Sequence, residues 1–256
     1  MRIASWNVNS LKQRLAKVES WVELRQPDIL AMQETKLADE AAPLMPFRMA
    51  GYDLAHHGEG RWNGVAIASR LGITDVSFGF QGTGPDAEGA RFVAARCGGI
   101  RVVTVYAPNG RALGTPAYAA KLDWYERLIA WLATNADPAD DLVLAGDLNI
   151  APADADVYDP AVYVGTTHTS PPERDCFQRL IDWGLIDAYR AFHPEPGRFT
   201  WWDYRAGNFH KGLGMRIDHL LVTKSLAARL TGAEIDRDAR KGPTPSDHAP
   251  LWLDAE

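Results

Sequence analysis

Leu142-Val143-Leu144-Ala145-Gly146-Asp147-Leu148-Asn149 is a short apolar run that ends in a carboxylate and an amide. Apolar runs of this length, bounded by polar or turn residues, are typical of strands buried in a sheet. Similar runs predict strands at residues 29–32, 65–68 and 102–107. Their regular recurrence predicts large sheets.

Amphipathic segments between these runs predict helices that cover the sheets. Apolar residues share one helical face over residues 11–22 and again over 118–132. A third helix is predicted after Ser170, which caps it, with Glu173 completing a capping box. The glycine-rich residues 79–89 are expected to form an exposed loop. Because strands dominate the later part of the chain, helices flanking a strand core fit better than a nucleotide-binding open sheet.

The composition is that of an ordinary folded protein. Of 256 residues, 46% are hydrophobic and 23% are charged, which excludes a disordered or collagen-like chain. The longest apolar run, residues 128–133, is far shorter than the about 20 residues that span a membrane. Two cysteines without metal-ligand spacing favour a reducing, cytoplasmic setting. Since no segment reads as a linker, we expect a single domain over residues 1–256.

The acidic charge balance bears only weakly on the ligand. Lys and Arg number 27 and Asp and Glu 33, so the net charge is −6. Affinity for nucleic acid usually comes from surplus Lys and Arg. Carboxylates gathered in one site would carry part of this negative charge, and a basic face could coexist with them.

Acids and amides recur at the edges of the predicted strands. Five separate segments carry them: Asn7, Glu34, the pair Asp147 and Asn149, Asp218, and the pair Asp247 and His248. Buried carboxylates are costly unless they are paired, hydrogen-bonded or bound to a cation. Convergence of the five segments would therefore require a cation.

The donor types narrow the choice of cation. Oxygen donors with one imidazole and no thiolate suit Mg²⁺ or Mn²⁺ better than Zn²⁺. Such an ion beside a His–Asp set is a common apparatus for phosphate ester hydrolysis. Taken alone, Glu34 could be a surface acid and residues 147–149 an ordinary turn. Their coincidence in one chain favours the metal-dependent site.

Six motifs spread from residue 5 to residue 250 resemble those of the exonuclease III type of AP endonucleases. They are Ser5-Trp6-Asn7-Val8-Asn9-Ser10-Leu11, Gln33-Glu34-Thr35-Lys36, Tyr106-Ala107-Pro108-Asn109-Gly110, Gly146-Asp147-Leu148-Asn149-Ile150, Arg216-Ile217-Asp218-His219-Leu220-Leu221 and Ser246-Asp247-His248-Ala249-Pro250. The resemblance implies a four-layered α/β sandwich, with two central mixed sheets flanked by helices. It also implies a magnesium-dependent DNA repair nuclease that cuts 5′ of abasic sites and removes 3′ blocking groups or 3′ nucleotides from duplex DNA.

The resemblance also implies roles for the residues of these motifs. Glu34 corresponds to the principal metal ligand, with Asn7 and Asp247 in support. Asp147 and Asn149 would hold the attacking water and a phosphoryl oxygen beside the metal. His248, oriented by Asp218, would contact the scissile phosphate and also counts among the candidate metal ligands. Tyr106 corresponds to the family's phosphate-side tyrosine. Either Asp147 or His248 could be the general base, and one metal ion or two could take part.

Candidate DNA contacts lie in or beside these motifs and in a further segment, residues 199–205, that also resembles the family. Two basic residues and one amide would meet the backbone, and three apolar residues would line the pocket for an abasic sugar: Lys36, Asn109, Arg111, Trp201, Met215 and Ile217. Asn9, Asn63 and Met215 depart from residues common in relatives and could alter specificity. In the alternative interpretation, Trp201 packs in the core and Trp202 faces solvent. The expected partner is duplex DNA, bound by a monomer away from membranes.

Two other function classes stay open at this point. Enzymes with the same phosphodiesterase core act on lipid or inositol phosphates, and a binding protein could keep the fold without the chemistry. The details of the first and fifth motifs favour DNA over lipid. Every expected metal and catalytic position is filled, which favours an enzyme over a binding protein.

Overall fold

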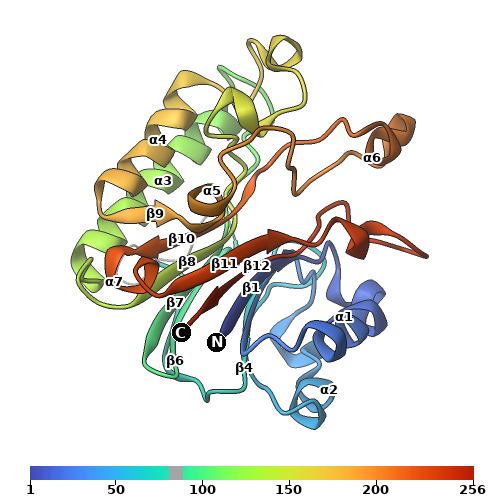
Figure 1. Ribbon diagram of the computed structural model, residues 1–256, viewed down its shortest axis with the longest axis vertical. Coiled ribbons are helices and arrows are strands. Elements are labelled where there is room, and N and C mark those ends of the chain that lie inside the picture. The colour runs from blue at the N-terminus through green and yellow to red at the C-terminus, as the bar shows by residue number, and fades with distance from the viewer. Residues whose placement is uncertain (81–88) are drawn as a thin grey trace.

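Two six-stranded mixed sheets lie face to face at the centre of the molecule (Figure 1). The computed structural model describes residues 1–80 and 89–256. Its strands are β1 (Arg2–Asn7), β2 (Ile29–Gln33), β3 (Asp53–His57), β4 (Val65–Ser69), β5 (Thr74–Phe78), β6 (Phe92–Cys97), β7 (Ile100–Tyr106), β8 (Leu142–Asp147), β9 (Leu185–Asp187), β10 (Asp218–Thr223), β11 (Leu230–Ile235) and β12 (Leu251–Ala255). The first sheet has the order β11-β12-β1-β2-β4-β3, and the second has the order β5-β6-β7-β8-β10-β9.

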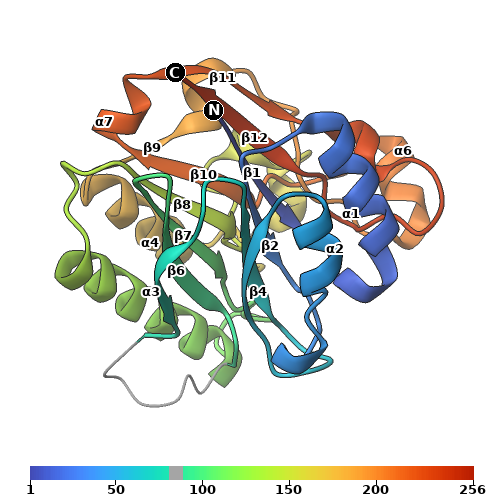
Figure 2. The ribbon, with the colours of Figure 1, turned by 90° about the horizontal axis from the view of Figure 1, so that it is seen from below.

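Helices cover the two outer faces of this pair of sheets. Those on the outer faces are α1 (Leu11–Arg25), α2 (Leu44–Met49), α3 (Pro116–Asn135) and α4 (Pro171–Asp182). The short helices α5 (Ala188–Phe192) and α7 (Lys224–Ala227) pack against the core between the sheets, and α6 (Asn208–Lys211) lies apart from both sheets. Short 3₁₀ segments lie at Asp39–Ala41, Asp154–Asp156, Pro160–Tyr163, Arg205–Gly207 and Arg237–Arg240. Figure 2 shows α1 and α2 on one side of the sheets and α3 and α4 on the other. The predicted four-layered α/β sandwich is therefore confirmed.

Burial on both faces explains why the strand sequences are continuously apolar. In β8, Val143 and Ala145 face the core between the two sheets, whereas Leu142 and Leu144 face α3 and α4. A separate core joins the first sheet to α1 and α2. Side chains alternate along a strand, so a strand covered on both sides needs an apolar residue at every position.

Strand direction determines which strand ends lie together. β1 and β2 are parallel, as are β7 and β8, while β10 is antiparallel to β8. The register places Asp218, the first residue of β10, opposite Asp147, the last residue of β8. The carboxyl ends of β1, β2 and β8 and the start of β10 therefore supply polar residues to one end of the sandwich.

The local predictions hold, with one correction. The four predicted strands are β2, β4, β7 and β8, and the predicted helices are α1, α3 and α4. Ser170 and Glu173 form the expected capping box at the start of α4. Of the predicted loop at 79–89, residues 81–88 lie outside the described part of the chain. Phe80 is not exposed as expected, because its ring packs against Phe92 and Trp124. Among residues 1–80 and 89–256, no helix combines the length and the apolar character needed to cross a membrane.

Candidate active site

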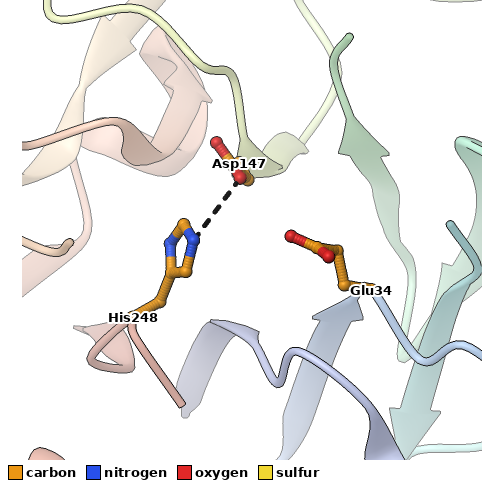
Figure 3. Close-up of side chains that lie close together, drawn as sticks. All are labelled: Glu34, Asp147 and His248. Atoms are coloured by element: carbon orange, nitrogen blue, oxygen red, sulfur yellow. Dashed lines mark ion pairs between the residues drawn. The ribbon is translucent and has the colours of Figure 1, made fainter. Parts of the chain in front are cut away.

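Polar residues from separate strands meet at this end of the sandwich. β1 ends at Asn7, Glu34 directly follows β2, Asp147 ends β8, and His248 lies in the segment before β12. Figure 3 shows Glu34, Asp147 and His248 pointing toward one another. One ligand atom from each of these three lies within 4.8 Å of the others. Residues 34, 147 and 248 of the sequence thus form one cluster.

Asn7 ties the two carboxylates of the cluster together. It is fully buried, and its amide nitrogen donates to Glu34 Oε1 at 2.9 Å and to Asp147 Oδ2 at 3.0 Å. Its oxygen accepts from the backbone N–H of Asn9 at 3.0 Å. Asn7 therefore presents its NH₂ group to the carboxylates and fixes their separation.

His248 lies between two carboxylates. Its Nδ1 is 2.8 Å from Asp218 Oδ2, and its Nε2 is 3.8 Å from Asp147 Oδ2. Burial alone lowers the pKa of an imidazole, but the Asp218 carboxylate outweighs it and the pKa of His248 rises to about 10. The ring is therefore charged at neutral pH, and both nitrogens are donors.

The cluster carries an excess of negative charge. Burial raises the pKa of Asp147 to about 8, and the carboxylates of Asp218 and Glu34 act in the same direction. The second oxygen of Asp218, Oδ1, is buried and has no hydrogen-bond partner among the residues that the structure describes. Crowded, partly unsatisfied carboxylates are stabilised by a cation.

The donor set fits a hard divalent ion. Glu34 and Asp147 offer carboxylate oxygens, whereas His248 would offer an imidazole nitrogen only after losing a proton, and the cluster contains no thiolate. Such donors suit Mg²⁺ or Mn²⁺. The side chain of Glu34 keeps 16% exposure, so the cluster is open to solvent on its side.

Tyr106 and two asparagines border the cluster. Tyr106 ends β7 and lies opposite Asp147 in the register of β7 and β8. Burial raises the pKa of Tyr106 well above its ordinary value, and the charges of Glu34 and Asp147 add to the effect. Asn109 Nδ2 donates to Asn149 Oδ1 at 3.3 Å. The hydroxyl of Tyr106 thus keeps its proton and lies against the Glu34 carboxylate.

Asp247 and Lys36 lie at the edge of the cluster, and the side chains of both are hydrogen-bonded. Asp247 accepts from Asn9 Nδ2 at 2.8 Å and from Trp201 Nε1 at 3.0 Å. Lys36 Nζ lies 2.8 Å from Glu34 Oε2 and donates to Asn9 Oδ1 at 2.5 Å. Lys36, predicted to contact DNA, is thus directed toward Glu34 in this structure.

The predicted pocket residues form one apolar wall. Met215 and Ile217 are buried and pack with the half-buried Trp201. A backbone bridge joins Trp201 to His248, which places the wall beside the cluster. Trp202 is 2% exposed and packs against Phe209, so the alternative in which Trp202 faces solvent is wrong.

Four residues near the cluster were missed by the sequence reasoning. Lys121, Tyr125, Glu173 and His168 all bond to the turn formed by Asp147, Leu148 and Asn149 or to one another. Tyr125 and Glu173 had been assigned only to helical packing and capping. The available signal was Lys121, a charged residue four positions before Tyr125 on the apolar face of a predicted helix.

Comparison with known proteins agrees with this geometry. The endonuclease/exonuclease/phosphatase family matches residues 4–248. The chain belongs to this family. Exodeoxyribonuclease III from Haemophilus influenzae is 34% identical to it, and the match covers 99% of each chain. The predicted resemblance is therefore confirmed, and the chain is a hydrolytic nuclease.

Solved structures extend the similarity to the whole fold. An AP endonuclease from Archaeoglobus fulgidus matches with a TM-score of 0.96 and 36% identity, covering 100% of this chain and 99% of that one. The 3′ phosphatase NExo from Neisseria, bound to a product DNA hairpin, matches with a TM-score of 0.96 and 41% identity over the same shares.

Proposed function

We propose that this protein is a Mg²⁺-dependent DNA repair nuclease. It hydrolyses the phosphodiester backbone 5′ of abasic sites and removes 3′ blocking groups or 3′ nucleotides from duplex DNA. The observation that carries the proposal is the cluster of Glu34, Asp147 and His248, held by Asn7 and Asp218, in a chain similar to nucleases over its whole length.

The cluster provides the donors for the cation. We assign Glu34 and Asp147 as its main ligands, with Asn149 and Asp247 as the further candidates. Asn7 and His248, also predicted as ligands, fit less well, because Asn7 directs its NH₂ group at the carboxylates and the charged His248 has a proton on each nitrogen. When bound, Mg²⁺ supplies positive charge that stabilises the phosphoryl oxygens and the leaving oxygen. Mn²⁺ prefers similar donors and is expected to substitute.

Three side chains of the protein, His248, Asp147 and Tyr106, are assigned separate roles in donating and accepting protons. His248 is a donor at both nitrogens, so its Nε2 is suited to hydrogen-bond a phosphoryl oxygen while Asp218 keeps the ring charged and oriented. Asp147 would be kept in its ionised form by a bound cation and could then accept the proton of the attacking water. Tyr106 keeps its hydroxyl proton and can donate it to a phosphate oxygen. Asn149 and Asn109 add amide contacts to the same phosphate.

The DNA contacts lie beside this centre. Arg111 is exposed just after Asn109 and is free to reach a backbone phosphate, which contributes sequence-independent affinity. Trp201, Met215 and Ile217 form an apolar wall suited to a deoxyribose that lacks its base. Extruding such a sugar costs little because its pairing and stacking are already lost.

The protein is also proposed to act as a monomer with one domain over residues 1–256, in the cytoplasm. One family match runs from residue 4 to residue 248 without division. Cys97 and Cys176 are both free and buried, which suits a reducing compartment.

The test offers labelled duplexes with an abasic analogue, a 3′ phosphate or an intact recessed end, each with Mg²⁺. We expect cleavage of all three, and the ratio of rates gives the substrate preference. An inositol polyphosphate and sphingomyelin vesicles serve as competing substrates. Cleavage of these in preference to every duplex would replace the DNA assignment with the lipid or inositol phosphate alternative.

A further inference from the structure

Two side chains of helix α3 bond to the turn formed by Asp147, Leu148 and Asn149. Lys121 and Tyr125 are four residues apart, so they lie on the same face of the helix, and both are fully buried. Tyr125 Oη donates to the carbonyl of Leu148. Lys121 Nζ donates to the carbonyl of Asn149 at 2.7 Å. Two successive carbonyls of the turn are thus bonded to one helix.

The surroundings of Lys121 match a charged ammonium group. Its Nζ has three acceptors: Glu173 Oε1 at 2.5 Å, Asn149 O at 2.7 Å and Asn109 O at 3.3 Å. An ammonium carries three N–H donors, so each acceptor receives one. Lys121 therefore joins α3, α4 and the two loops that carry Asn109 and Asn149.

Glu173 completes the arrangement from α4. Its Oε1 also accepts from Thr167 Oγ1 at 2.6 Å and from the backbone N–H of His168 at 2.9 Å. His168 Nδ1 lies 2.7 Å from the same Asn149 carbonyl that Lys121 bonds. Since Lys121 and Glu173 are both fully buried, each charge depends on the other for its stabilisation.

A hydrogen bond within the turn connects these contacts to the carboxylate of Asp147. The backbone N–H of Asn149 donates to Asp147 Oδ1 at 2.9 Å. Asn149 has φ 50°, a left-handed conformation that asparagine adopts more readily than most residues other than glycine. The Leu148 carbonyl, which Tyr125 bonds, and the Asn149 N–H belong to one planar peptide group, so holding this carbonyl fixes the direction in which the N–H points. Leu148, which Tyr125 of α3 bonds, directly follows Asp147, whose carboxylate faces Glu34 and His248.

We propose that Lys121 and Tyr125, fixed by Glu173, are positioning residues that orient Asp147 and Asn149 for hydrolysis without touching the substrate. The inference rests on the proposed function of this site. Loss of the Tyr125 bond lowers kcat and leaves KM nearly unchanged, because Tyr125 bonds Leu148, which is not among the proposed DNA contacts.

The test compares two hydroxyl deletions on the same helix. Tyr125→Phe removes the bond to Leu148, whereas Tyr118→Phe removes a bond to Ser170 Oγ at 2.6 Å, away from the turn. On a 3′-phosphate duplex with saturating Mg²⁺, we expect kcat of Tyr125→Phe to fall about tenfold with KM within about twofold. Tyr118→Phe is expected to keep the wild-type kcat. Equal kcat in both variants, or a change in KM alone, overturns the inference.

The ion pair is tested by a neutral double variant. Lys121→Met alone leaves Glu173 buried without a partner and is expected to lower the melting temperature sharply. Adding Glu173→Gln removes that charge and keeps the capping box, because glutamine can also close it. We expect the double variant to recover melting temperature but to stay about a hundredfold low in kcat. Full recovery of kcat would contradict a positioning role.

A readout without substrate separates this inference from the proposed function. Amide hydrogen exchange at Asn149 reports whether its N–H still bonds to Asp147. We expect faster exchange in Tyr125→Phe and no change in Tyr118→Phe. Unchanged exchange in both variants overturns the inference, whereas failure of the wild-type protein to cleave DNA overturns only the proposed function.

Discussion

Replacing Asp218 by asparagine removes the charge that holds His248 while keeping the shape of the side chain. Asp218 is fully buried and its Oδ2 lies 2.8 Å from His248 Nδ1. Hydrogen bonds to a charged group contribute about 1.5 to 3 kcal/mol. If this energy is used mainly in the transition state, kcat should fall about 10-fold to 150-fold.

The assay is steady-state cleavage of a 3′-phosphate duplex, with duplex binding measured in parallel. We expect Asp218→Asn to lower kcat and to leave DNA affinity within about twofold, because Asp218 is buried behind the imidazole. The control is Asp141→Asn, which changes an aspartate at the opposite end of β8 that bonds Arg229 and Ser225. A kcat of Asp218→Asn equal to that of the control would refute the role assigned to the Asp218 and His248 pair.

Three further outcomes are expected. Trp201→Ala should keep most of its stability, since the ring is only half-buried, and should lose preference for abasic over intact duplex; an unaltered preference would remove Trp201 from the pocket. Arg111→Ala should weaken duplex binding and reduce the slope of log affinity against log salt concentration by about one. An unchanged slope would mean that Arg111 makes no contact with a DNA phosphate. Asp187 has a pKa held well below its ordinary value: burial acts to raise it, but the Arg216 guanidinium at 2.8 Å outweighs burial. Its contribution to the free energy of unfolding is therefore complete above about pH 5 and is lost progressively as the pH falls toward the lowered pKa of the folded state. The denaturant midpoint should fall less between pH 7 and pH 3 in Asp187→Asn than in the wild-type protein. An equal fall in the two proteins would contradict this role of Asp187.

The layers and the main cluster were predictable because they depend on local pattern. Continuous apolar runs such as residues 142–145 identify strands buried on both faces, and polar residues at their ends identify a site. Glu34, Asp147 and His248 were placed together on this ground and through the resemblance, and the structure brings them within reach of one cation.

The remaining features depend on side-chain direction, which the pattern does not contain. Lys36 sits in a matched motif, yet its ammonium turns toward Glu34. Trp201 and Trp202 are neighbours in sequence, and the packing of Phe209 against Trp202 decides which ring is buried. Lys121 received no role from the sequence, because its partners come from α4 and from two loops and are not visible in the pattern of its own helix.

Glu34, Asp147 and His248 are proposed to form a cation-dependent hydrolytic centre for DNA. The direct measurement is cleavage of a labelled 3′-phosphate duplex by the wild-type protein and by Asp147→Asn, in excess chelator and after Mg²⁺ is restored. We expect no wild-type cleavage in chelator, full recovery with Mg²⁺, and a loss of several orders of magnitude in Asp147→Asn at unchanged duplex affinity. Full wild-type cleavage in chelator, or a near-native rate in Asp147→Asn, would contradict it.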